Sequence, residues 1–247
     1  MRRRRAAAWH VATIVESRPE TTTARRIVLD VPTWPGNEAG SHLDVRLTAP
    51  DGYQATRSYS IASSGDGTRV ELAVDELPDG EVSPFLVHDL RPGDQLELHG
   101  PLGAFFVWTP PVENASLRPV QLIAGGSGVV PLFAMAAAHA AAGDATEFRL
   151  LYSVRTPDDV FFRDELAALA AASLRLDLVY TRRTPIGWPA PAGRVTRAVL
   201  NAAAVPAASR PLVYVCGPTP FVETVASWLV EDGHAPGHVR TERFGGS

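Results

Sequence analysis

Short apolar segments separated by glycine, proline or aspartate make up the first half of the chain. They are rich in Val, Ile, Leu and Thr, and several alternate apolar and polar positions with a period near two. Many short strands at this spacing predict an antiparallel β-barrel or a sandwich. We expect these strands at residues 10–15, 26–31, 42–47, 58–62 and 70–74.

One short helix is expected among these strands, at residues 83–90. Ser83 fits its N-cap, and Pro84 fits the first helical position, where no backbone N–H is needed. Residues 100–103, Gly-Pro-Leu-Gly, are expected to form a tight structural turn near the last strand of the barrel.

The pattern changes after residue 118, where apolar strands begin to alternate with helices. This alternation predicts a parallel, doubly wound α/β sheet. Strands are expected at residues 119–124, 148–153, 174–180 and 212–216, and helices at 132–142, 164–172, 195–202 and 221–231. We therefore divide the chain into a basic tail (1–8), a β-barrel domain (9–112), a linker (113–118) and an α/β domain (119–247).

Composition narrows the classes of function. The 247 residues have a net charge of −4, and no basic stripe indicates nucleic-acid binding. All 23 basic residues are arginine, so a lysine Schiff base is excluded, and the single cysteine excludes an internal disulfide or a cluster held by four thiolates. No apolar run approaches the roughly 20 residues of a membrane helix. We expect a cytoplasmic protein without a membrane segment and without a metal site.

Two segments of the expected barrel carry groups suited to a flat ligand with phosphates. Arg57 and Tyr59 are two residues apart on one strand, so they share a face that offers a guanidinium and a phenol ring, while Ser60 points the other way unless the strand bulges. An ordinary barrel strand is the alternative. Gly80, Glu81, Val82 and Ser83 precede the short helix, where backbone N–H groups bind anions; simple capping is the alternative.

Two further motifs lie in the expected α/β domain. The glycine turn at residues 125–128 follows a strand and precedes a helix, and glycine at 126 and 128 would let a nicotinamide or pyrophosphate approach the backbone. A tight turn without a ligand is the alternative. Cys216 ends the last expected strand, at the edge where open α/β sheets bind ligands, although a lone cysteine is commonly an inert buried thiol.

Taken in order, these motifs resemble the ferredoxin–NADP reductase superfamily, and the resemblance extends over about residues 9–247. The motifs are Arg57-x-Tyr59-Ser60, Gly80-x-x-Ser83, Gly125-Gly126-x-Gly128-x-x-Pro131, Cys216-Gly217-Pro218 and the terminal Glu242-x-Phe244. The resemblance implies that the barrel holds FAD and that the α/β domain holds NAD(P)H.

The resemblance also implies roles for individual residues. Arg57 would contact the flavin phosphates, Tyr59 would pack on the isoalloxazine, and Ser60 would reach its N5 edge. Ser58, Val74 and the segment Gly80, Glu81, Val82 and Ser83 would complete the flavin site. Gly125, Gly126, Ser127, Gly128, Pro131, Gly217 and Pro218 would line the nucleotide site. Cys216 would lie beside the reacting nicotinamide carbon, Glu242 near the flavin edge, and Phe244 over the ring.

The expected choice of nucleotide depends on two strand ends. Ser153 and Arg155 end one expected strand, and Arg182 and Arg183 follow the next; relatives that use NADPH grip its 2′-phosphate with such residues. We expect NADPH, the alternative being that these arginines are solvated surface cations. Asp75-Glu76 stands where relatives often carry a basic residue, which leaves FMN open in place of FAD.

The expected function is a flavoprotein reductase that takes hydride from NAD(P)H onto bound FAD. Its electrons would pass to a separate acceptor, namely a ferredoxin, an oxygenase component or another redox protein. Two alternatives stay open: a reductase of free flavin, ferric chelates or quinones, and a flavin- and nucleotide-binding sensor without turnover.

Overall fold

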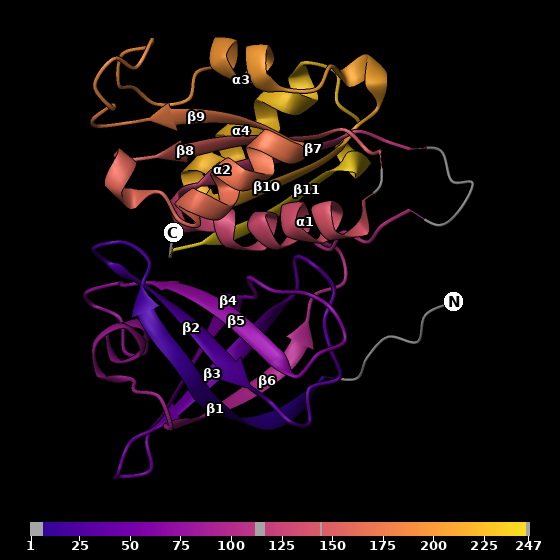
Figure 1. Cartoon of the computed structure of the whole chain (residues 1–247). Helices are drawn as coiled ribbons and strands as arrows, with labels where there is room; N and C mark the ends of the chain where they lie inside the picture. Colours follow the sequence, from indigo (N-terminus) through magenta and orange to yellow (C-terminus); the bar gives the residue numbers. More distant parts are fainter. Residues whose placement is uncertain (1–6, 112–116, 144, 246–247) are drawn as a thin grey trace. The chain divides into compact units, whose positions relative to one another are not determined.

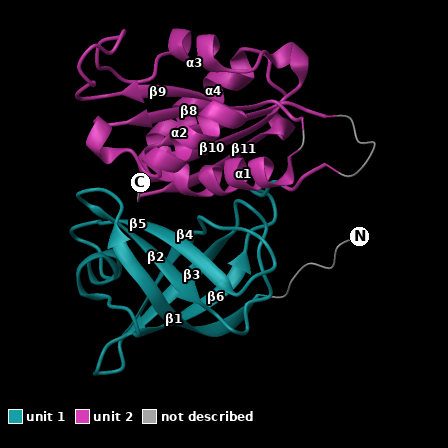
Figure 2. Ribbon diagram, viewed as in Figure 1, with its two compact units in different colours: residues 1–108 teal, residues 109–247 magenta. Residues whose placement is uncertain are grey.

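Two compact units make up the chain in the computed structural model, which describes residues 7–111, 117–143 and 145–245. Unit 1 comprises residues 1–108 and unit 2 residues 109–247 (Figure 2). Most of the predicted tail (residues 1–6) and most of the predicted linker (residues 113–116) lie outside the described residues, as does residue 112 at the end of the predicted barrel domain.

Unit 1 is a six-stranded antiparallel sheet (Figure 1), as the period-two pattern predicts. Its strands lie in the order β4-β3-β6-β1-β2-β5, and an isolated bridge between Ile61 and Leu72 joins the chain beyond β4 to β5, so that the sheet curls into a half-barrel. The strands are β1 (Ala8–Pro19), β2 (Ala24–Asp30), β3 (His42–Thr48), β4 (Gln54–Ser60), β5 (Arg69–Asp75) and β6 (Gln95–Leu102).

Strand β6 differs from the expected turn at residues 100–103. The strand runs through Gly100 and ends at Leu102, so the Gly-Pro pair belongs to its end. A Cβ atom at Gly100 would lie 3.0 Å from the Trp34 ring and 3.1 Å from Cβ of Leu43. Glycine at position 100 therefore lets β6 pass close to the core. This close packing, and not a turn, requires glycine here.

The expected short helix is present in a different form. It is a π-helix, η1 (Phe85–Asp89), and its N-cap position is Pro84, which makes no side-chain capping bond. The prediction that Ser83 caps this helix is therefore wrong. The Ser83 hydroxyl instead accepts a hydrogen bond from the backbone N–H of Leu77 at 3.0 Å, because the loop at 77–80 folds back against it.

Unit 2 is a five-stranded parallel sheet in the order β11-β10-β7-β8-β9, which confirms the doubly wound α/β prediction (Figure 1). Its strands are β7 (Val120–Gly125), β8 (Phe148–Val154), β9 (Leu174–Tyr180), β10 (Leu212–Pro218) and β11 (Val239–Phe244). Its helices are α1 (Val129–Ala142), α2 (Arg163–Ala172), α3 (Arg197–Ala203) and α4 (Thr219–Glu231).

Strand β11 was not expected from the hydrophobic pattern. Its sequence, Val-Arg-Thr-Glu-Arg-Phe, is mostly polar because it lies at the edge of the sheet, where its residues are half-buried or exposed. Residues 212–216 are consequently not the last strand, as the sequence suggested. Cys216 and Gly217 pair with Glu242 and Arg243 of β11, so β10 is an inner strand of the sheet.

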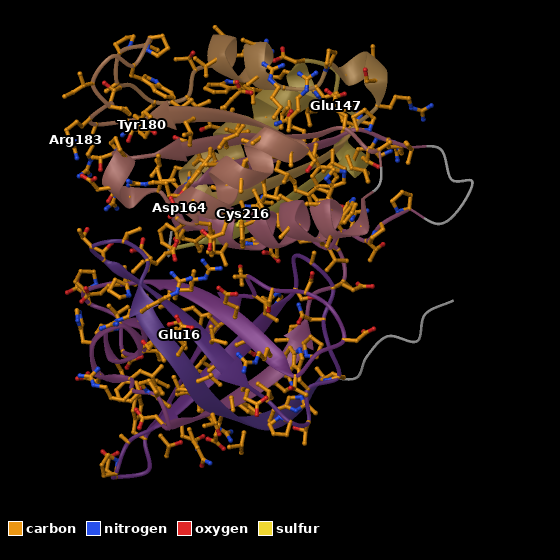
Figure 3. All side chains as sticks on the ribbon, viewed as in Figure 1. Glu16, Glu147, Asp164, Tyr180, Arg183 and Cys216 are labelled. Carbon is orange, nitrogen blue, oxygen red and sulfur yellow. The ribbon has the colours of Figure 1, made fainter. Side chains whose placement is uncertain are left out.

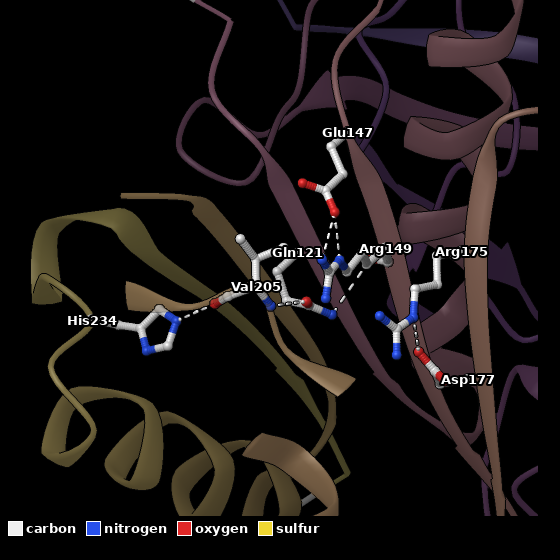
Figure 4. Close-up of polar contacts among 7 residues, drawn as sticks. All are labelled: Gln121, Glu147, Arg149, Arg175, Asp177, Val205 and His234. Carbon is white, nitrogen blue, oxygen red and sulfur yellow. Dashed lines mark hydrogen bonds and ion pairs between the residues drawn. The ribbon is translucent and has the colours of Figure 1, made fainter. Parts of the chain in front are cut away.

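A buried polar network fixes the segment after α3 to the middle of this sheet (Figure 4). The side-chain Oε1 atom of Gln121 on β7 accepts a hydrogen bond from the N–H of Val205 at 2.9 Å. The Nε2 atom of His234, beyond α4, lies 3.0 Å from the carbonyl oxygen of Val205. Because buried backbone groups need partners, these two side chains hold the connection between α3 and β10 in one place.

The direction of winding reverses between two neighbouring strands of unit 2. The chain moves from β7 to β8 and β9 on one side, and β10 and β11 then lie on the other side of β7. Open α/β sheets bind ligands at the carboxyl ends of the strands that flank such a reversal. In this sheet those ends are Gly125 of β7 and Cys216–Pro218 of β10.

Candidate functional site

Strand β4 presents Arg57 and Tyr59 on one face, as their spacing predicts. Tyr59 pairs with Leu43 and Arg57 with Val45, and both partners are core residues of β3. Paired residues of antiparallel strands project to the same side of the sheet. Arg57 and Tyr59 therefore lie on the side of the core, at the end of the barrel where β4 meets the loop before η1.

Tyr59 is half-buried and packs against the core cluster of unit 1. Burial raises the pKa of its phenol to about 12, an effect that the nearby Arg57 guanidinium partly offsets. The ring is therefore a neutral, fixed aromatic surface at any physiological pH, as a stacking partner for a flat ligand requires.

Arg57 and Glu81 form an ion pair that links β4 to the segment at 80–83. The Arg57 Nη2 atom lies 2.5 Å from the Glu81 Oε2 atom, and the Tyr53 hydroxyl donates to Glu81 Oε1 at 2.8 Å. The Arg57 Nη1 atom donates to the backbone carbonyl of Thr56. The two segments expected to bind flavin phosphates thus meet at one guanidinium.

Several residues expected in the flavin site use their side chains elsewhere. Ser58 lies on the other face of β4, where its hydroxyl donates to Asp44 at 2.6 Å. The side chains of Val74 and Val82 are buried in the core of unit 1. Val74 and Val82 could therefore meet a ligand through their backbone atoms and not through their side chains. Ser60 is the last residue of β4 and pairs with His42 of β3.

The two acidic residues at the end of β5 both have partners within the chain. The Asp75 carboxylate accepts a hydrogen bond from the Thr23 hydroxyl at 2.9 Å. The Glu76 carboxylate lies 3.0 Å from His88 of η1. Both carboxylates that stand where relatives often carry a basic residue are therefore engaged by side chains of this chain, just before β2 and in η1.

At the reversal in unit 2, glycine is required by the packing of the chain on itself. A Cβ atom at Gly128 would lie 2.3 Å from the carbonyl oxygen of Cys216, and one at Gly125 would lie 2.9 Å from the Phe221 ring. The packing of the turn against the end of β10 is therefore enough to require glycine at position 128, and an approach of a ligand to its backbone stays a prediction. Gly126 differs: its φ is +56° and nothing lies within 4 Å of its Cβ position.

The other residues of this turn differ in exposure. Ser127 is half-buried in the 3₁₀ turn η2 (Gly126–Gly128), whereas Pro131 is buried in the first turn of α1. Gly217 lies against Phe221 and Gly125, and Pro218 is exposed at the end of β10. Of the residues expected to line the nucleotide site, three have solvent-accessible surface at the reversal: Gly126, Ser127 and Pro218.

Cys216 and Glu242 are paired residues of the adjacent strands β10 and β11 (Figure 3 labels Cys216). Only 3% of Cys216 is exposed. Burial, together with the Glu242 carboxylate, raises the pKa of its thiol well above the usual value. Burial also raises the pKa of Glu242 to about 7. The thiol is therefore neutral, and Glu242 can gain or lose a proton near neutral pH.

Phe244 lies two residues beyond Glu242 and is the last residue of β11. It pairs with Pro218, and 38% of the residue is exposed. The resemblance places an aromatic cover here, and the strand brings its ring to the same end of the sheet as Cys216.

The carboxyl ends of β8 and β9 bring the expected arginines together. The N–H groups of Arg182 and Arg183 both donate to the carbonyl oxygen of Arg155, at 2.9 and 3.2 Å. Arg183 forms an ion pair with Asp158 (Figure 3 labels Arg183). Among the described residues, no carboxylate forms an ion pair with Arg155 or Arg182. Ser153 is buried one residue before the end of β8.

Two residues of these sites gave no signal in the sequence. Tyr53 holds Glu81, but it precedes β4 in a turn and is separated from Glu81 by 28 positions. Asp158 neutralises Arg183 from 25 positions away. Its sequence context, Thr156-Pro157-Asp158-Asp159, indicates only a capped turn, which it also forms.

Two family descriptions match the chain, one in each unit. Residues 15–107 match an oxidoreductase FAD-binding domain, and residues 122–227 match an oxidoreductase NAD-binding domain. Ferredoxin–NADP reductase B of Sorangium cellulosum is 34% identical over 218 residues, which cover 84% of this chain and 85% of the relative.

Other similar proteins are longer than this chain. The glycine betaine monooxygenase reductase subunit of Chromohalobacter salexigens is 32% identical over 79% of this chain, and the match covers 53% of that subunit. The chain thus spans about half the length of this relative. Among solved structures, a cytochrome P450 reductase of Amycolatopsis has a TM-score of 0.82 at 27% identity, covering 96% of this chain and 70% of that protein.

Proposed function

Because this chain belongs to the ferredoxin–NADP reductase family of flavoprotein oxidoreductases, we propose that it takes hydride from NADPH onto FAD and delivers electrons to a separate redox protein. The proposed acceptor is an oxygenase component or a ferredoxin. Bound FAD would supply the redox chemistry, because a flavin can accept the two electrons of a hydride and release them one at a time.

The residues of unit 1 fit a flavin with a phosphate chain. Arg57 offers a partly exposed guanidinium, and Tyr59, on the same face, offers a fixed aromatic ring. We assign the phosphates to Arg57 and the isoalloxazine to Tyr59. The backbone of the segment Gly80–Ser83 would complete the phosphate site, since the side chains of Val82 and Ser83 are buried.

The residues of unit 2 fit a nicotinamide nucleotide at the carboxyl ends of the strands. Gly126 leaves open space in the turn after β7, and Cys216 offers a small neutral side chain at the end of β10. An apolar, uncharged group next to a nicotinamide excludes water without competing for the hydride. Glu242, with a pKa of about 7, would hold or release a proton next to this position.

One observation carries the proposal: the winding of unit 2 reverses where Gly126 and the Cys216–Glu242 pair lie together. Arg155 and Arg182, at the ends of β8 and β9, form no ion pair with a carboxylate of the described residues, and this supports NADPH over NADH. A guanidinium binds a phosphate with two hydrogen bonds, and a ribose without the 2′-phosphate has no group that uses this charge.

The function is tested by reduction of a one-electron acceptor. Purified protein with FAD and NADPH should reduce a ferredoxin or an oxygenase component catalytically, and omission of FAD should abolish the reaction. Faster reduction of free flavin or ferric chelate than of any protein acceptor would overturn the proposed partner. Binding of FAD and NADPH without reduction of any acceptor would indicate a sensor and overturn the proposed function.

A further inference from the structure

We propose that Glu81 weakens flavin binding by competing with the flavin phosphates for Arg57. Glu81 would thus be a residue that lowers the affinity for the cofactor, which goes beyond the proposed function. The proposal rests on that function in one respect, the assignment of a flavin phosphate to Arg57.

The geometry places an anion where a phosphate is expected. The Glu81 Oε2 atom lies 2.5 Å from Arg57 Nη2, a distance typical of a charge-assisted hydrogen bond. Arg57 Nη1 is used by the carbonyl oxygen of Thr56. Both Nη atoms of the guanidinium therefore already have an acceptor, so a phosphate that approaches Nη2 competes with the carboxylate for this donor.

The Glu81 carboxylate is held in place from both sides. The Tyr53 hydroxyl donates to its other oxygen at 2.8 Å. Its backbone lies between Gly80, whose N–H donates to the Leu77 carbonyl at 2.8 Å, and Val82, which is fully buried. The ion pair thus has a fixed position, although each of its side chains is about half exposed, at 52% for Arg57 and 47% for Glu81.

Charge gives the direction of the effect. A dinucleotide flavin carries two phosphates, and a carboxylate beside them is repelled whether or not it leaves Arg57. The Arg57–Glu81 pair is neutral as a unit, so it attracts a phosphate less than Arg57 alone would. The expected consequence is a flavin that binds reversibly and exchanges with free flavin.

The test compares wild-type protein with Glu81→Gln, which keeps the size of the side chain and removes its charge. The dissociation constant for FAD is measured by fluorescence titration of flavin-free protein, and the release of FAD is followed from the flavin-loaded protein. We expect Glu81→Gln to bind FAD roughly two- to fivefold more tightly, with slower release, as for one exposed charge pair. Weaker or unchanged binding would overturn the inference.

Glu16→Gln is the matched control. Glu16 also pairs with an arginine, Arg18, at 3.0 Å, and its side chain is similarly exposed at 52%, but it lies on β1. Loss of its charge should leave FAD affinity unchanged. Equal tightening in both variants would assign the effect to net charge and would overturn the role of Glu81.

Two further variants keep the inference and the proposed function separable. Tyr53→Phe removes the second hold on Glu81 and should tighten FAD binding in the same direction by less, even if Glu81→Gln does not fold. Arg57→Ala should weaken FAD binding. If Arg57→Ala has no effect, the assigned phosphate site fails; if it weakens binding and Glu81→Gln does too, only the competition fails.

Discussion

Cys216 and Glu242 lie side by side on two parallel strands, and burial changes the proton affinity of both. The thiol stays protonated, whereas the carboxyl group titrates near pH 7 instead of near its usual value of 4.5. A folded-state pKa above the unfolded value means that the folded protein keeps a proton that the unfolded chain releases. Stability from this group is complete below pH 4.5 and declines as the pH rises through 7.

Glu242→Gln should remove this dependence on pH. Between pH 5 and pH 8 the free energy of unfolding of the wild type should fall relative to that of the variant, because only the wild type must ionise a buried carboxyl group. Urea denaturation at several pH values measures this difference. Glu223→Gln, which removes an exposed carboxylate of α4, is the control. Parallel curves for wild type and Glu242→Gln would contradict the assigned environment.

At the scale of elements, the turn after β7 packs directly against the end of β10. Gly128 abuts the carbonyl group of Cys216, and the end of β10 cannot withdraw because it pairs with both β7 and β11. The glycines of this turn thus serve packing first. Gly126 differs, because nothing lies within 4 Å of its Cβ position.

Gly128→Ala should therefore destabilise unit 2. A Cβ atom 2.3 Å from a backbone carbonyl oxygen forces the turn and β10 apart, and we expect a loss of about 1–3 kcal/mol in the free energy of unfolding. Gly193→Ala is the control, since nothing lies within 4 Å of its Cβ position. Denaturant unfolding distinguishes the two, and equal stabilities would show that the turn adapts without cost.

The ends of β8 and β9 provide the test of nucleotide choice. Arg155→Ala with Arg182→Ala should raise the Michaelis constant for NADPH about tenfold or more and leave that for NADH nearly unchanged. Asp158→Asn, which frees Arg183, should lower the constant for NADPH. Arg175→Ala, at the other end of β9, is the control. An equal effect of the double variant on both nucleotides would reject the 2′-phosphate role.

Local patterns predicted most elements, and long-range contacts account for what they missed. Strand β9 lies at the expected residues 174–180, because its neighbours in the sequence delimit it. Edge strand β11 lacks an apolar pattern, and the local sequence predicts a cap at Ser83 because its actual partner, Leu77, lies outside the helix. The resemblance assigns Arg57 and Glu81 to the flavin site. It does not predict that they form an ion pair or that Tyr53 bonds to Glu81, because these contacts depend on how β4 meets the loop before η1.

At the scale of the whole molecule, each unit carries one half of a redox reaction. We propose that the cation and aromatic ring of unit 1 serve the flavin, and that the glycine turn and thiol–carboxyl pair of unit 2 serve the nicotinamide. No helix of the described residues is both long and apolar enough to cross a membrane.

The most direct test of hydride transfer is an anaerobic titration of the FAD-loaded protein with NADPH and then, in a second sample, with NADH. The account predicts that one equivalent of NADPH bleaches the flavin absorbance and that NADH acts more slowly or at higher concentration. A flavin spectrum that neither nucleotide changes would contradict the account, because transfer between NADPH and FAD is its central claim.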